Sequence, residues 1–471
     1  MNQLAHWTGD HLREAPGGPP PRRLSVFKFF LRYPIFLLAF GPPVFRTKGV
    51  DVTEGTLDVW SFLQVGLFFA VAGWAILRLS TAQSILIPGK IRSVLKYGFL
   101  LSLLFMASTL YSPSRVSTGA YSILYFLTWV CIVEFINDAY RNPPDWVQCL
   151  LQLRLIALLL FVLVLACLAI DPVMVMAILP GIGIRLSGNA VAPVPFICPM
   201  MMLVSAYAFL YSLEPRKRSV FFFLIGLAGV LTTRSRGCEI SLFLSLSILG
   251  IAWATATKRS AYKFIAALSA LVLLSGMVVA VFGGEHIWKT FNRGASASNI
   301  ESFSGRTEMW KFIIHYCMTH PQGMGYVAGF RLVFRNYYSL TTGTNLSQLG
   351  TAHNTLFDIL AGAGWLALAV YLILLAKLVW LAWRFIRKQS RLNPADDSAS
   401  RHGIRCSLVL LFYCFVYGMG ATEFLAPLRA GFNYEYILIA IILGACARML
   451  AVSRGGQVFS PSGPAKGLRI K

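Results

Sequence analysis

The chain has 471 residues, of which 56% are hydrophobic and only 13% charged, and its mean hydropathy is +0.65. A soluble domain carries about 25% charged residues, so this composition excludes an ordinary soluble protein and predicts a polytopic membrane protein. The net charge of +23 is typical of Lys and Arg that anchor short cytoplasmic loops, so we expect no nucleic-acid partner. The scattered cysteines have neither disulfide nor metal-ligand spacing, and we expect no metal site.

Transmembrane helices dominate the predicted fold. A helix needs about 20 apolar residues to cross the hydrocarbon core, and the chain offers about twelve such stretches. This predicts an all-α fold with about twelve transmembrane helices. The stretches lie near 26–45, 57–77, 94–110, 118–137, 151–170, 192–212, 219–233, 238–256, 261–283, 355–385, 404–422 and 432–451.

Basic residues set the predicted topology. With the N-terminus inside, "EPRKR", "TKRSAYK" and "RFIRKQSRLNPADDSASRHGIR" all face the cytoplasm. The expected organisation is a cytoplasmic N-terminal tail (1–25), nine spans (26–283), a large outer loop domain (284–354), three spans (355–451) and a cytoplasmic C-terminal tail (452–471).

Two arginines oppose the charge bias of this topology. Arg234 and Arg236, in "LTTRSRGCEI", fall in a short outer turn. A single arginine at a span end can reach the lipid headgroups, but a pair beside a large outer loop suits an anion at the outer surface. Arg185, in "GIGIRLSGN" on another outer loop, is a weaker candidate for the same role.

The large outer loop contains a predicted amphipathic helix, "RTEMWKFIIHYCMTH", which Pro321 ends. Its apolar residues recur at helical spacing: Trp310, Ile313, Ile314 and Cys317. Arg306 lies in its first turn, where the helix N-terminus already favours an anion. The glycine-rich "PQGMGYVAGF" that follows is typical of a structural turn.

The tenth apolar stretch runs for about 30 residues, or roughly 45 Å, which is more than a bilayer requires. We therefore expect it to tilt or to project outward. His353 lies at its outer N-terminal end, where the helix dipole keeps an imidazole neutral and able to accept a proton. Asp358, one turn further on, is a helix-start charge or a partner of that base. The other outer histidines favour surface or capping roles: His286, His315 and His320.

Three motifs, "SGRTEMW", "HPQGMGY" and "HNTLFDILAGAGW", resemble those of the O-antigen ligase family, which is related to O-antigen polymerases and bacterial protein O-oligosaccharyltransferases. The family's histidine motif corresponds to His353-Asn354 and Gly364. Ala367 stands where the family has a second small or polar residue, a departure that we expect to affect packing rather than chemistry.

The resemblance implies a GT-C-type glycosyltransferase in the bacterial inner membrane, with a periplasmic active site, no cofactor and no metal. It implies an undecaprenyl-diphosphate-linked O-antigen as donor, lipid A-core oligosaccharide as acceptor, and inversion at the anomeric carbon. His353 is then the predicted general base, supported by Asn354 and Asp358. No acidic pair on the outer side suits a metal, so arginine would stabilise the diphosphate. The candidates are Arg234, Arg236, Arg306 and, more weakly, Arg185.

Other functions remain open from the sequence. A polymerase would use a second lipid-linked glycan as acceptor, and a protein O-oligosaccharyltransferase would use a Ser or Thr side chain. A lipid-linked glycan flippase of twelve spans is the alternative from another class. That class favours charged groups near the bilayer midplane and internal repeats, whereas charges here lie near span ends, apart from Lys377.

Overall fold

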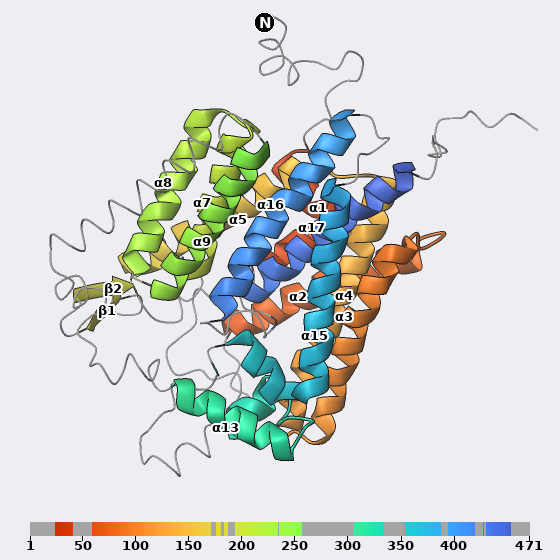
Figure 1. Ribbon diagram of the computed structural model, residues 1–471, viewed down its shortest axis with the longest axis vertical. Coiled ribbons are helices and arrows are strands. Elements are labelled where there is room, and N and C mark those ends of the chain that lie inside the picture. The colour runs from red at the N-terminus through yellow and green to blue at the C-terminus, as the bar shows by residue number, and fades with distance from the viewer. Residues whose placement is uncertain are drawn as a thin grey trace, which may run out of the picture.

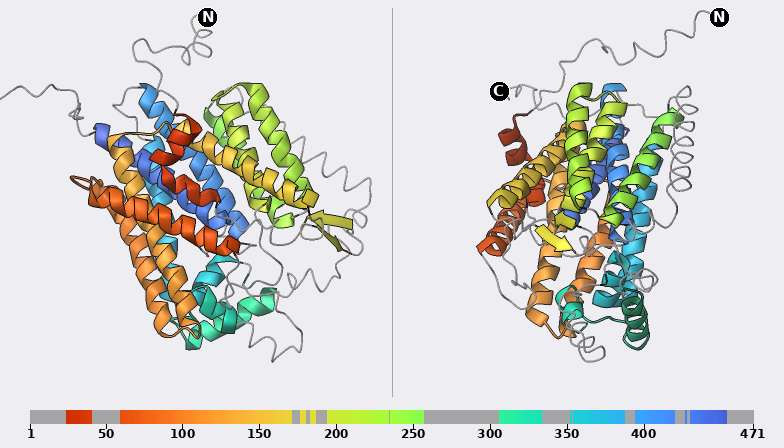
Figure 2. Two further views of the ribbon diagram at one scale, coloured as in Figure 1. Left: turned by 180° about the vertical axis from the view of Figure 1, so that it is seen from behind. Right: turned by 90° about the vertical axis from the view of Figure 1, so that its left-hand side faces the viewer.

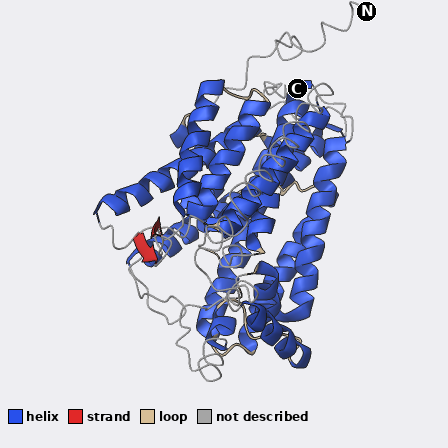
Figure 3. Ribbon diagram, turned by 60° about the vertical axis from the view of Figure 1, so that its left-hand side comes forward, coloured by secondary structure: helices blue, strands red, loops and turns tan. Residues whose placement is uncertain are grey.

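The computed structural model describes residues 24–40, 59–170, 176–179, 183–186, 194–233, 235–256, 306–333, 352, 354–387, 394–419, 427 and 430–453. Most of these residues are helical (Figure 1). The strands among them are β1 (Met176–Leu179) and β2 (Gly183–Leu186), which pair as an antiparallel hairpin. Figure 3 shows this hairpin beside the helices, at one edge of the molecule.

Seven of the described helices are long and apolar enough to cross a membrane. The chain is therefore a multi-pass membrane protein, as its composition predicts. These helices are α2 (Val59–Ser80), α3 (Gly89–Ala107), α4 (Arg115–Arg141), α5 (Trp146–Ile170), α9 (Arg236–Ala256), α15 (Thr355–Arg387) and α17 (Ala430–Ser453).

Three further helices coincide with predicted spans: α7 (Val194–Leu210), α8 (Arg216–Thr233) and α16 (Pro394–Gly418). Helix α7 has only 17 residues, and α8 and α16 begin with charged sequence, "RKR" and "PADDSASRHGIR". The predicted span at 261–283 lies outside the described residues.

Helix α17 forms the centre of the bundle. It contacts α16 and α4, and almost all of its side chains are buried. Helices α5, α7, α8 and α9 pack on one side of it, and α2, α3, α4 and α15 lie on the other (Figures 1 and 2). The hydrophobic core is continuous across both groups.

The first predicted span, 26–45, is not a single helix where the structure describes it. Helix α1 (Val26–Arg32) is followed by the 3₁₀ helix η1 (Pro34–Phe40). The break follows from Pro34, which lacks an N–H and disfavours helical geometry at the preceding Tyr33. The buried side chain of Asn433 on α17 donates to the carbonyl oxygen of Leu38 at 2.8 Å, so η1 is anchored on the central helix.

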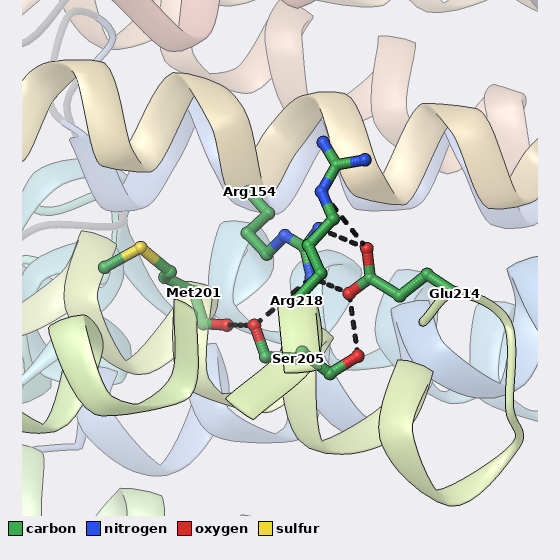
Figure 4. Close-up of polar contacts among 6 residues, drawn as sticks. Arg154, Met201, Ser205, Glu214 and Arg218 are labelled. Carbon is green, nitrogen blue, oxygen red and sulfur yellow. Dashed lines mark hydrogen bonds and ion pairs between the residues drawn. The ribbon is translucent and has the colours of Figure 1, made fainter. Parts of the chain in front are cut away.

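A buried ion pair joins α5 to the turn between α7 and α8 (Figure 4). Arg154 donates to both carboxylate oxygens of Glu214, and Ser219 also donates to Glu214 at 2.8 Å. Burial alone would raise the pKa of Glu214, but the hydrogen bonds from Arg154 and Ser219 lower it below its ordinary value. The Arg154 and Glu214 side chains are both almost fully buried. Each therefore needs the opposite charge of the other to offset the free-energy cost of removing its own charge from water.

A second charged cluster joins α2 to α4. Arg78 Nη1 lies 2.6 Å from Glu134 Oε1, and Arg78 Nη2 lies 3.1 Å from Asp138 Oδ1. Arg78 also donates to the carbonyl oxygen of Arg32 at 2.8 Å, which ties the end of α1 to the same cluster. These charges stand near the ends of their helices rather than at the midplane.

The predicted amphipathic helix is present as α13 (Arg306–Thr319). Met309, Ile313 and Cys317 are fully buried, but Ile314 is 40% exposed, contrary to its predicted place on the apolar face. Ile313 and Ile314 are successive residues of a helix and point about 100° apart, so only one of them faces the protein. Figure 1 shows α13 at the end of the molecule where α15 begins, opposite the end where α16 begins.

Candidate active site

Helix α15 is broken near its N-terminal end, a feature that the length of the apolar stretch does not predict. Gly364 has φ 77° and ψ −173°, far from helical values. The carbonyl oxygens freed by the break are used by the glycine-rich turn: Met324 N donates to Ala361 O at 2.7 Å, and Gly325 N donates to Gly362 O at 2.9 Å. Two motifs about 40 residues apart in sequence thus pair through their backbones.

Glycine is required at this junction because the two backbones touch. A Cβ on Gly364 would lie 1.9 Å from the carbonyl oxygen of Pro321. Gly323 has φ +84°, and a Cβ there would lie 2.7 Å from Ala361 O. Trp365 N donates to Pro321 O at 3.1 Å and completes the pairing. The "PQGMG" and "LAGAGW" segments are therefore one structural unit.

The end of α3 holds the other side of the same turn. After η3 (Ser108–Leu110), Tyr111 donates through its hydroxyl to Gln322 O at 2.5 Å. Tyr326 N donates to Ser108 Oγ at 3.0 Å, and the Tyr326 ring stacks on Phe105 at 3.8 Å between centroids. The turn is fixed between α3 and the break in α15.

Polar side chains fix the first turn of α15. Asn354 caps the helix, since its Oδ1 accepts from Leu356 N at 2.9 Å. Asn354 Nδ2 donates to Met419 O, at the end of α16, at 3.1 Å. The buried Asp358 accepts from Ala352 N at 2.8 Å. Both predicted supporting residues therefore hold backbone at the start of α15.

His353 lies outside the described residues, but both of its neighbours are held. The N–H of Ala352 donates to Asp358, and its carbonyl oxygen accepts a hydrogen bond from Trp310 Nε1 of α13 at 2.9 Å. The Trp310 ring also stacks on Phe357 of α15, 5.2 Å between centroids. With Asn354 fixed on the other side, the backbone entering and leaving position 353 is clamped between α13, α15 and α16.

Arg306, at the start of α13, interacts electrostatically with Tyr417, near the C-terminal end of α16. Its side chain is half-buried, and burial lowers the pKa of Arg306, an effect that the nearby Tyr417 of α16 opposes. A Cβ on Gly237, in the first turn of α9, would lie 3.8 Å from the Tyr417 ring. Tyr417 therefore lies beside the start of α9 and interacts electrostatically with Arg306, and it stands two residues before the Met419 that holds Asn354.

The other predicted arginines are described only in part. Arg234 lies outside the described residues, and the structure describes only the backbone of Arg236 and Arg185. Arg236 opens α9, so its backbone lies beside Tyr417. Arg185 is in β2, opposite Ala177, and this strand contacts the end of α8.

Sequence reasoning missed the contribution of α16. Tyr417 and Met419 carry no motif that marks them, and the turn before α17 looks like an ordinary loop. The glycine pairing did have a signal: Gly362 and Gly364 interrupt an apolar stretch that is longer than a bilayer needs.

Comparison with known families bears directly on this region. Residues 221–372 match the model of the O-antigen ligase family. This part of the chain is similar in sequence to O-antigen ligases. The O-antigen ligase region covers about a third of the 471 residues and includes α9, α13, the glycine-rich turn and the broken part of α15. No curated protein matches the chain.

The family assignment defines the class of activity. The protein has an O-antigen ligase- or polymerase-like function and is a glycosyltransferase-like membrane enzyme. The matched residues contain the backbone pairing between 321–325 and 361–365, so the unit built by the glycines is part of the family domain.

Proposed function

We propose that the protein is an O-antigen ligase that transfers a glycan from undecaprenyl diphosphate to lipid A-core oligosaccharide, without metal and with inversion. The observation that carries this proposal is the meeting of four helix ends, those of α9, α13, α15 and α16. Tyr417 lies beside the start of α9 and interacts electrostatically with Arg306, and the chain on both sides of His353 is held by α13, α15 and α16.

The reaction needs a base and a stabilised leaving group. The acceptor hydroxyl oxygen attacks the anomeric carbon opposite the diphosphate, a new C–O bond forms, and the bond to the diphosphate oxygen breaks. His353 takes the hydroxyl proton, a role that typically contributes about 10²–10⁴-fold in rate. The clamped backbone supports this role because general-base catalysis depends on fixed geometry.

Arginine would stabilise the charge that develops on the departing diphosphate. The guanidinium is planar, stays charged at working pH and matches phosphate oxygens. Burial lowers the pKa of Arg306, and the charge of a partly buried guanidinium is screened less than it would be in water. Arg236 and Arg234 would act with it, and Arg185 more weakly from the hairpin beside α8.

We place the enzyme in the bacterial inner membrane, with twelve spans of GT-C type, both termini cytoplasmic and the site periplasmic. Support comes from the distribution of charge. Helix α8 begins with the basic sequence "RKR", and the basic sequence "RFIRKQSR" precedes α16, which begins at the end of the molecule opposite α13 (Figure 1). Basic residues favour the cytoplasmic side, so α13 and the start of α15 would face the periplasm.

The experiment is a transfer assay with purified protein in EDTA. One undecaprenyl-diphosphate glycan is offered separately to lipid A-core, to a second lipid-linked glycan and to a Ser/Thr peptide. Transfer to lipid A-core identifies a ligase, chain growth on the second glycan identifies a polymerase, and peptide modification identifies a protein O-oligosaccharyltransferase. Translocation without transfer would indicate a flippase.

Paired variants test the site in the same assay. His353→Ala should lose activity by at least about 10²-fold, whereas His315→Ala, on the exposed face of α13, should retain it. Arg306→Ala should lower the rate by on the order of 10²–10³-fold. Full activity of His353→Ala would remove the base assignment, and unchanged donor kinetics of Arg306→Ala would remove the diphosphate role.

A further inference from the structure

An open groove lies at the end of the bundle opposite the candidate active site. Its lining residues belong to α7, α9, α15 and α16, and α16 lies between α9 and α15 (Figure 1). The groove has a volume of about 530 Å³, within the roughly 300–1,000 Å³ that is usual for small-molecule sites. By the predicted topology it opens to the cytoplasmic leaflet.

The walls of the groove are apolar and face outward. Ile251 on α9 and Trp383 on α15 are each 49% exposed, and Leu408 and Phe412 of α16 lie between them. In a membrane such a surface contacts acyl chains. Lipid tails are as apolar as these side chains, so the lining alone gives no preference for one lipid over another.

The preference comes from cations at the groove. Arg405 is half-buried in its lining, and no ion pair joins Arg405 to a carboxylate within the part of the chain that the structure describes. Arg387, in the last turn of α15, lies over the ring of Trp383 at 4.2 Å, and Trp383 lines the groove. An apolar groove with unneutralised cations at its edge is complementary to an anionic amphiphile.

We infer that this groove binds an anionic phospholipid of the cytoplasmic leaflet, with its phosphate at Arg405 and an acyl chain between Ile251 and Trp383. Basic pockets between transmembrane helices on the cytoplasmic side recognise anionic headgroups, and each cation near such a surface contributes to that attraction. The site is separate from glycan transfer and does not depend on the proposed reaction.

The test measures lipid retention by the purified full-length protein. After delipidation in detergent, the protein is titrated with phosphatidylglycerol or with phosphatidylcholine of the same acyl chains, and bound lipid is counted by native mass spectrometry. We expect one phosphatidylglycerol to bind at least about fivefold more tightly than phosphatidylcholine. Equal affinity for the two lipids, or no retained lipid, would overturn the inference.

Matched variants locate the site. Arg405→Gln should abolish the preference and Arg405→Lys should retain most of it, whereas Lys217→Gln, an exposed cation at the start of α8, should leave it unchanged. Ala252→Trp, which fills the groove lining, should block binding although Arg405 is intact. Equal losses in Lys217→Gln and Arg405→Gln would show general surface attraction and contradict a defined site.

Discussion

Replacing Gly364 with alanine should detach the glycine-rich turn from α15 and disable the enzyme. Alanine at φ 77° and ψ −173° costs about 1–3 kcal/mol in backbone strain. Its Cβ would meet Pro321 O at 1.9 Å, so the turn must move away. The three hydrogen bonds donated by Met324, Gly325 and Trp365 are each worth about 0.5–1.5 kcal/mol. The total is roughly 3–7 kcal/mol, enough to open the pairing without unfolding the bundle.

Hydrogen exchange and the transfer assay together measure this effect. The amides of Met324, Gly325 and Trp365 should lose protection, and transfer should fall by about 10²-fold, because small displacements of a catalytic group carry that cost. Gly66→Ala is the control, since nothing lies within 4 Å of a Cβ at that helical position, and it should be neutral or slightly stabilising. Unchanged hydrogen exchange and unchanged transfer in Gly364→Ala would show that the pairing of the turn with α15 does not position the site.

Three further predictions concern particular contacts. Asn354→Ala removes the cap of α15 and the hydrogen bond to α16, and it should lower the free energy of unfolding by about 1 kcal/mol. It should also lower the transfer rate more than the control Asn142→Ala, which lies outside the site; equal rates for the two variants would contradict a positioning role for Asn354. Glu214→Gln leaves Arg154 buried without a counter-charge and should lower the free energy of unfolding, measured by denaturant titration, by about 3–5 kcal/mol. Replacing both Arg154 and Glu214 by Met should lower it less, and a less stable double variant would contradict this. Because the Glu214 pKa is lowered in the folded state, its stabilising contribution should be complete above the unfolded pKa of about 4.3. It should be lost as pH falls from that value through the lower folded pKa, and a pH-independent effect of Glu214→Gln on stability would be the contrary result.

The sequence predicts most of the helices because each depends on local properties. Span length, apolar composition and basic flanks are sufficient to locate α2 to α5 and α17, and helical spacing is sufficient for α13. The exceptions have local causes as well. Pro34 divides the first predicted span, and the successive Ile313 and Ile314 cannot share a narrow face. Both exceptions follow from the local sequence alone.

The candidate site depends on contacts that no local rule predicts. The histidine motif and the glycine-rich turn are visible in the sequence. The pairing of 321–325 with 361–365, however, depends on the break at Gly364 and on the hydrogen bonds that hold the turn against the end of α3. The hydrogen bond of Asn354 to Met419 and the packing of Tyr417 beside the start of α9 join segments from distant parts of the chain. Only the packing of the bundle determines which of these ends meet.

The most direct measurement of the central claim is photo-crosslinking with a diphosphate-linked polyprenyl donor that carries a photoreactive group beside the diphosphate. Labelled peptides should come from the start of α9, from the start of α13 around Arg306 and from the segment around His353, and labelling should be lost when unmodified donor competes. Labelling confined to the opposite end of the bundle, near the starts of α8 and α16, would contradict that claim.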